Sequence, residues 1–130
     1  MKRTLLLISV VSVFAALLGA QDDAAYMTAM KAVNASNRPL RMAVMGKDVA
    51  AASAEATKIA ASFDTILAYW TAKKADDAIK LATTARDAAK TIAGAKDADA
   101  QAAAMTTLSG TCMSCHSVHR GGMPPNFEIK

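Results

Sequence analysis

The chain contains few of the residues that usually build a large core or a binding platform. Of its 130 residues, only 5% are aromatic, two are cysteine, and nine are glycine or proline. So little glycine and proline excludes a collagen-like or linker-type protein. The net charge of +4 is not gathered into a basic run beyond Lys73-Lys74. Because aromatic stacking residues are also scarce, we expect no nucleic-acid partner.

Alanine is the residue that the chain has in excess, with 31 copies. By contrast, Val, Ile, Leu and Phe together supply only 15 of residues 21–130. Alanine is the strongest helix former, so we expect slim helices in a single domain. A core made of such helices lacks large side chains, and a bound group could supply the missing volume.

The first twenty residues have the layout of a secretory signal peptide. Lys2 and Arg3 precede an apolar run of 14 residues, Leu5 to Leu18, and Gly19-Ala20 offers a small-residue cleavage site. A membrane-spanning helix needs about 20 apolar residues, so we expect cleavage rather than anchoring. The predicted mature protein is therefore periplasmic, begins near residue 21, and has no integral membrane segment.

Apolar periodicity predicts four helices, over residues 23–37, 48–71, 76–93 and 97–120. Pro39 should interrupt or kink the first stretch, and Asp48 is a suitable N-cap for the second. The second helix carries a seam with alternating spacings of three and four: Val49, Ala52, Ala56, Ile59, Phe63, Ile66 and Trp70. Such a seam is typical of a packed bundle. The expected fold is all-α, an antiparallel up-down-up-down four-helix bundle over residues 21–120, followed by an irregular tail over residues 121–130.

One motif carries a specific chemistry. Cys112-Met113-Ser114-Cys115-His116 has the C-x-x-C-H spacing by which c-type haem is attached. On a helix, Cys112 and His116 are one turn apart, and Cys115 lies beside them. Two thiols can then bond the porphyrin while the imidazole of His116 is the proximal iron ligand. We therefore expect one covalently bound haem c.

Three other interpretations of these residues were weighed. Cys112 and Cys115 could form a structural disulfide in an oxidising compartment. A thioredoxin-like redox pair would need a βαβ context, which the sequence lacks. A zinc site could combine both cysteines with His116 and His119, but four ligands within eight residues of one helix hardly converge tetrahedrally. Otherwise we expect His119 to be a partly exposed surface residue.

The arrangement Cys112-x-x-Cys115-His116-x-x-x-Arg120 on the last helix of an exported bundle resembles class II c-type cytochromes, the cytochrome c′ and cytochrome c-556 group. The resemblance implies haem on the C-terminal helix and a function as a one-electron carrier, not an enzyme. It also implies transient redox protein partners and allows a homodimer. Arg120 matches a basic residue of the family and would lie near the haem.

The family places its distal haem face against the first helix, where members with Met are six-coordinate carriers. By that resemblance Met30 is the expected distal ligand, with Met27 as the runner-up. Tyr26 stands where many members carry Arg, so the partner of the haem propionates is left open among Lys31, Arg38 and Arg41.

Two alternative functions follow. If no methionine binds the iron, the resemblance implies a five-coordinate cytochrome c′ that binds NO or CO. If no haem is attached, the chain is a cofactor-free, alanine-rich helical interaction protein with a Cys112–Cys115 disulfide.

Overall fold

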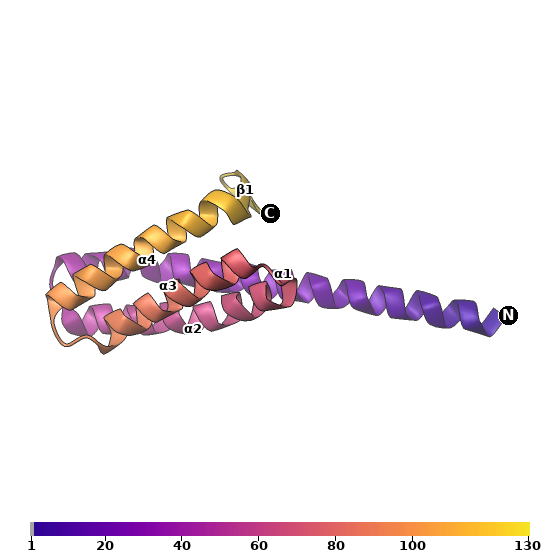
Figure 1. The fold of residues 1–130 in the computed structure, drawn as a ribbon, viewed down its shortest axis with the longest axis horizontal. Coiled ribbons are helices and arrows are strands. Elements are labelled where there is room, and N and C mark those ends of the chain that lie inside the picture. The colour runs from indigo at the N-terminus through magenta and orange to yellow at the C-terminus, as the bar shows by residue number, and fades with distance from the viewer. Residues whose placement is uncertain (1) are drawn as a thin grey trace.

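A computed structural model describes the backbone of residues 2–130 and the side chains of residues 22–130. It has four helices, α1 (Lys2–Met45), α2 (Val49–Lys73), α3 (Asp76–Gly94) and α4 (Ala98–His119), and two short strands, β1 (Arg120–Met123) and β2 (Asn126–Ile129). Successive helices run antiparallel to one another (Figure 1). The prediction of an all-α helical bundle is thus confirmed.

The predicted seam of α2 forms the centre of the core. All its members are buried except Val49, which is half-buried. The helix begins where expected, because the side chain of Asp48 accepts a hydrogen bond from the Ala51 N–H at 3.0 Å. Asp97 caps α4 in the same way, accepting from the Ala100 N–H at 2.8 Å. Each cap satisfies a helix N–H that would otherwise lack a partner.

Pro39 does not interrupt the first helix, contrary to expectation. α1 continues through it to Met45, and the following residue, Leu40, is completely buried in the core. A proline inside a helix leaves the carbonyl four residues earlier without its usual partner. That residue is Ala35, which is exposed, so water can satisfy the carbonyl. Burial of Leu40 favours continuing the helix.

The N-terminal part of α1 projects well beyond the other three helices (Figure 1). Tyr26 is the first buried residue among the described side chains. Among the residues described, no helix has the length and apolar character required to cross a membrane. Cleavage near residue 20 stays a prediction.

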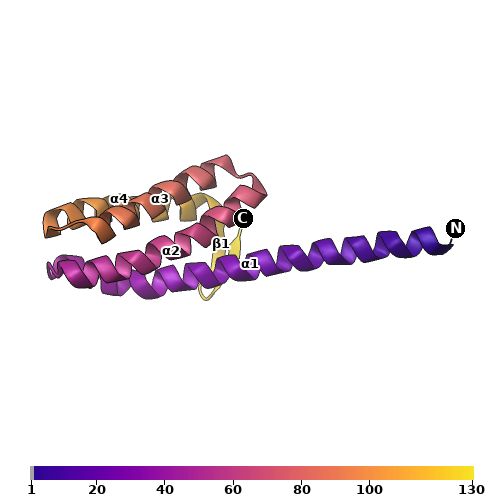
Figure 2. The ribbon, with the colours of Figure 1, turned by 90° about the horizontal axis from the view of Figure 1, so that it is seen from below.

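The bundle is closed on three sides and opens on the fourth. α1 packs along α2, α2 along α3, and α3 along α4, whereas α1 and α4 touch only sparsely. Figure 1 shows α4 diverging from the other helices toward its C-terminal end. Figure 2 shows the β1–β2 hairpin crossing from that end toward α1. The end of α4 that carries the cysteines therefore borders the opening between α1 and α4.

The C-terminal tail is ordered, where the sequence predicted irregular structure. β1 pairs antiparallel with β2, Arg120 opposite Ile129 and Met123 opposite Asn126. Gly122 has a positive φ of 73°, and a Cβ there would collide with the carbonyl oxygen of Asn126, so the hairpin requires glycine at this position. Ile129 packs against the core, which anchors the hairpin to the bundle.

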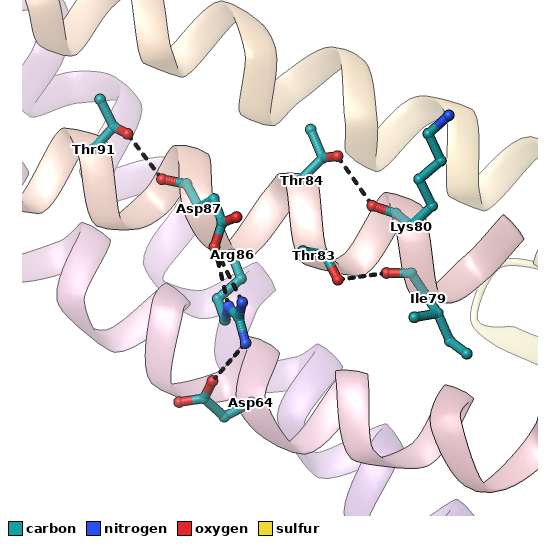
Figure 3. A network of polar contacts seen from close by, with 8 residues as sticks. All are labelled: Asp64, Ile79, Lys80, Thr83, Thr84, Arg86, Asp87 and Thr91. Carbon is teal, nitrogen blue, oxygen red and sulfur yellow. Dashed lines mark hydrogen bonds and ion pairs between the residues drawn. The ribbon is translucent and has the colours of Figure 1, made fainter. Parts of the chain in front are cut away.

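The α2–α3 side carries a network of polar contacts, drawn in Figure 3. The guanidinium of Arg86 on α3 lies 3.7 Å from the Asp64 carboxylate on α2 and 3.2 Å from that of Asp87. The threonines of α3 donate to carbonyls one turn earlier, as Thr83 does to Ile79 at 2.8 Å. Arg86 and the threonines of α3 thus find partners within the chain.

Candidate cofactor site

A cleft, here called the inner cleft, lies among the four helices. Its walls are mainly apolar, with contributions from every helix. They comprise Met30, Val33, Asn34, Asn37, Ile59, Phe63, Ile66, Leu81, Ala82, Ala85, Leu108, Thr111, Cys112, Cys115 and His116.

All three reactive residues of the C-x-x-C-H motif line the inner cleft. Cys112, Cys115 and His116 lie on one side of α4, as their spacing predicted, and each is half-buried. Both cysteines are free thiols. Burial raises the pKa of Cys112, and the neighbouring Cys115 adds to the shift. Burial is also the main cause of the raised pKa of Cys115, with a smaller contribution from Asp77.

The imidazole of His116 is held in the form that binds metals. Burial lowers its pKa, and the positive charge of Arg120 lowers it further. A neutral imidazole has a free nitrogen lone pair, which is what iron requires. The local environment therefore favours His116 as a ligand.

A second space, here called the outer cleft, lies under the β1–β2 hairpin and measures about 1230 Å³. It shares Met30, Asn34 and His116 with the inner cleft, so the two adjoin. Met27 lines the outer cleft but not the inner cleft. Of the two candidate methionines, only Met30 thus shares the inner cleft with both cysteines and His116.

The candidate cations divide into two groups. Arg120 and Lys31 line the outer cleft, whereas Arg38 and Arg41 line neither cleft and are exposed. The guanidinium of Arg120 lies over the Phe127 ring, 4.5 Å from its centroid, a cation–π geometry that fixes the side chain beside the cleft. Of the three residues considered for the propionates, the geometry favours Lys31.

His119 is more enclosed than the sequence predicted, since only 13% of its side chain is exposed. Its ring stacks on Trp70 with centroids 4.8 Å apart, and its Nε2 lies 2.8 Å from a carboxylate oxygen of Asp77. Trp70 also packs against Tyr26 and Tyr69, and the three rings form an aromatic cluster. Sequence reasoning missed this cluster because its members come from α1, α2, α3 and α4; only Trp70, through the α2 seam, gave a signal.

The donor set fits a covalently attached haem. Two thiols and an imidazole lie on α4, a thioether lies on α1, and the walls between them are apolar. Two thiols and an imidazole are the groups by which c-type haem is attached, and a thioether is one of its possible second ligands. Among the described side chains, no three of His, Cys, Asp and Glu are grouped to hold a metal ion. The four residues of the zinc alternative do not form such a group.

Comparisons with known proteins return no match, whether with family models, curated proteins or solved structures.

Proposed function

We propose that the chain is an exported monohaem c-type cytochrome of the class II kind and acts as a one-electron carrier in the periplasm. The observation that carries this proposal is the convergence of Cys112, Cys115, His116 and Met30 on one apolar cleft. The C-x-x-C-H spacing is specific for covalent haem. Bound haem c would supply the iron couple that accepts and releases single electrons.

The residues of the cleft have distinct functions in this proposal. Cys112 and Cys115 hold the cofactor through thioethers, and His116 is the proximal ligand, kept neutral by burial and Arg120. Met30, on the facing helix, is the distal ligand. Apolar walls such as Phe63 and Ile66 exclude water and help set the reduction potential. Arg120 adds a positive charge beside the proximal ligand.

Covalent attachment is tested first. The full chain is expressed in a host that matures c-type cytochromes, and haem is stained after denaturing electrophoresis. We expect a stained band for the wild type and none for the double variant Cys112→Ala/Cys115→Ala. A wild-type band without stain would leave the cofactor-free helical protein as the function to pursue.

Axial ligation is tested next, by visible spectra of the oxidised and reduced protein. We expect a low-spin wild type, and a high-spin spectrum for Met30→Ala. Met27→Ala is the matched control, because Met27 lies one turn away and lines only the outer cleft; it should stay low-spin. A high-spin wild type would instead indicate the five-coordinate binder of NO or CO.

A further inference from the structure

Charge is distributed unevenly between the two sides of the bundle. Residues 24–47 and 100–127, which form most of the described part of α1, most of α4 and most of the hairpin, contain five cations and no carboxylate. The carboxylates in the described parts of these elements lie at their ends: Asp22, Asp23, Asp99 and Glu128. Residues 48–99 contain eight carboxylates and seven Lys or Arg residues. All five cations are exposed, and none has an ion pair among the described residues: Lys31, Arg38, Arg41, Lys47 and Arg120.

Two of these cations lie at the opening between α1 and α4, and two more follow on α1. Lys31 and Arg120 line the outer cleft, together with one carboxylate, Glu128. Arg38 is seven residues after Lys31, so it lies two turns further along the same side of α1. Arg41 follows three residues later, next to that side. We call Lys31, Arg38, Arg41 and Arg120 the cationic rim.

Exposed apolar side chains occur on the same elements. Every large hydrophobic residue that is exposed in the described part of the chain lies on α1, on α4 or in the hairpin, and none lies on α2 or α3: Met42, Met45, Met113, Val118, Met123 and Phe127. Four of the six are methionine, whose flexible thioether adapts to different partner surfaces.

The composition of this face favours a protein over a membrane as the occupant. Methionine and arginine are enriched at protein–protein interfaces, and lysine is depleted. Three of the four rim cations are arginine, whereas six of the seven cations in residues 48–99 are lysine. A membrane-surface helix usually carries Trp, Phe and Leu between its cations. Among the described residues, Phe127 is the one exposed aromatic side chain on this face.

We propose that the cationic rim and the methionines around it dock the acidic surface of a protein redox partner over the α1–α4 opening. This proposal rests on the proposed function, since the opening would contain the cofactor. A face with an excess of one sign of charge accelerates association with an oppositely charged partner, and salt weakens the effect. The mixed charges on α2 and α3 give no such attraction.

The test measures binding of the haem-loaded protein to poly-L-glutamate, used as an acidic polypeptide probe, at low and at raised salt. The double variant Arg38→Glu/Arg41→Glu replaces two positive charges of the cationic rim with negative charges. The matched control, Lys80→Glu/Lys90→Glu, makes the same charge change at exposed positions on α3. We expect the rim variant to lose about tenfold or more in affinity at low salt, and the control to lose much less. At raised salt the affinities of the rim variant and the control for poly-L-glutamate should differ less, because salt screens the charges.

Three outcomes would overturn the docking proposal. One is an equal loss in both double variants, which would indicate attraction by net charge alone. Another is no measurable binding to poly-L-glutamate at low salt. A third is rim-dependent binding to phosphatidylglycerol vesicles that exceeds binding to poly-L-glutamate, which would indicate a membrane surface. Haem staining of the same samples reports separately on the proposed function, so either proposal can fail without the other.

Discussion

The two sides of this bundle differ in how they use an alanine-rich sequence. On α2 and α3, small residues such as Ala56 and Ala89 are buried and let the helices pack closely, and ionic groups such as Arg86 find partners nearby. Between α1 and α4 the helices diverge around an apolar cleft, and the exposed cations of residues 24–47 form no ion pair among the described residues. The closed side thus stabilises the fold, while the open side presents reactive and charged groups.

Loss of the proposed cofactor should produce the largest effect, because the inner cleft that it would fill is lined by all four helices and α1 and α4 otherwise touch only sparsely. In Cys112→Ala/Cys115→Ala we expect backbone amides of α1 and α4 to lose most of their protection from hydrogen exchange, while α2 and α3 keep more of theirs. The reason is that the apolar wall of the inner cleft would lose its contacts and become exposed to water. Mass-spectrometric exchange of both proteins measures this. Equal protection and an equal thermal melt would contradict it.

A cavity in the closed side should cost nearly as much. Ile92 on α3 has no exposed surface, so Ile92→Ala removes buried methyl groups from close packing. We expect a loss of about 2–5 kcal/mol in the free energy of unfolding, measured by urea denaturation of the holoprotein. Met113→Ala is the control on the open side, where the side chain is 74% exposed; its effect should stay within about 0.5 kcal/mol. Similar losses in the free energy of unfolding for the two variants would contradict the proposed difference between the closed side and the open side.

The closed side was also the more predictable one. The seam of α2 and the Asp48 cap follow local rules of spacing and hydrogen bonding, and the structure has them as expected. The cysteines and His116 were placed correctly on one side of α4, because a helix fixes the relation of neighbouring turns. Which residues of α1 lie opposite these three side chains depends on how far α1 and α4 diverge. No local sequence pattern determines that divergence.

The errors share one physical cause, which is that distant contacts override local preferences. The glycines and prolines of residues 121–125 predicted an irregular tail, yet docking of Ile129 on the core orders a hairpin. Pro39 predicted an interruption or a kink, but burial of Leu40 favours a helix that continues to Met45. The contacts of His119 were not predicted, because its partners Trp70 and Asp77 lie far away in the chain.

The contact between His119 and Asp77 links the two sides of the bundle. Breaking it should reduce stability by a moderate amount. Because it holds the end of α4 to α3, Asp77→Asn should increase hydrogen exchange in the last turns of α4. The hydrogen bond from His119 lowers the pKa of Asp77, so its contribution to stability exists at neutral pH and is lost as the pH falls through that pKa. Asp77 is exposed, so the loss of stability should be well below that of Ile92→Ala.

Asp76→Asn is the matched control for this prediction, since Asp76 is the neighbouring exposed carboxylate and has no ion pair among the described residues. Exchange in the last turns of α4 should be unchanged in it. Equal effects in the two variants would mean that the negative charge at the start of α3 matters, and not the contact with His119.

The smallest effect should appear at alkaline pH, where the aromatic cluster joins α1 to α2. The Tyr69 hydroxyl donates to the Asp23 carboxylate at 2.9 Å. Burial, together with this bond and the charge of Asp23, raises the pKa of Tyr69 from 10.0 to about 12. An unfolded chain therefore ionises this group first, and the stability that it contributes is present below pH 10 and declines between about pH 10 and 12.

Urea denaturation at several alkaline pH values measures that decline, with Tyr69→Phe as the control. The variant lacks the titrating hydroxyl, so its stability should fall less steeply over this range. It should still fall, because the pKa of Tyr26 is also raised, mainly by burial. Parallel curves for the two proteins would show that the bond to Asp23 does not couple Tyr69 to folding. The α1–α2 contact would then depend on packing of the aromatic rings alone, as the α2–α3 contact depends on packing of alanines.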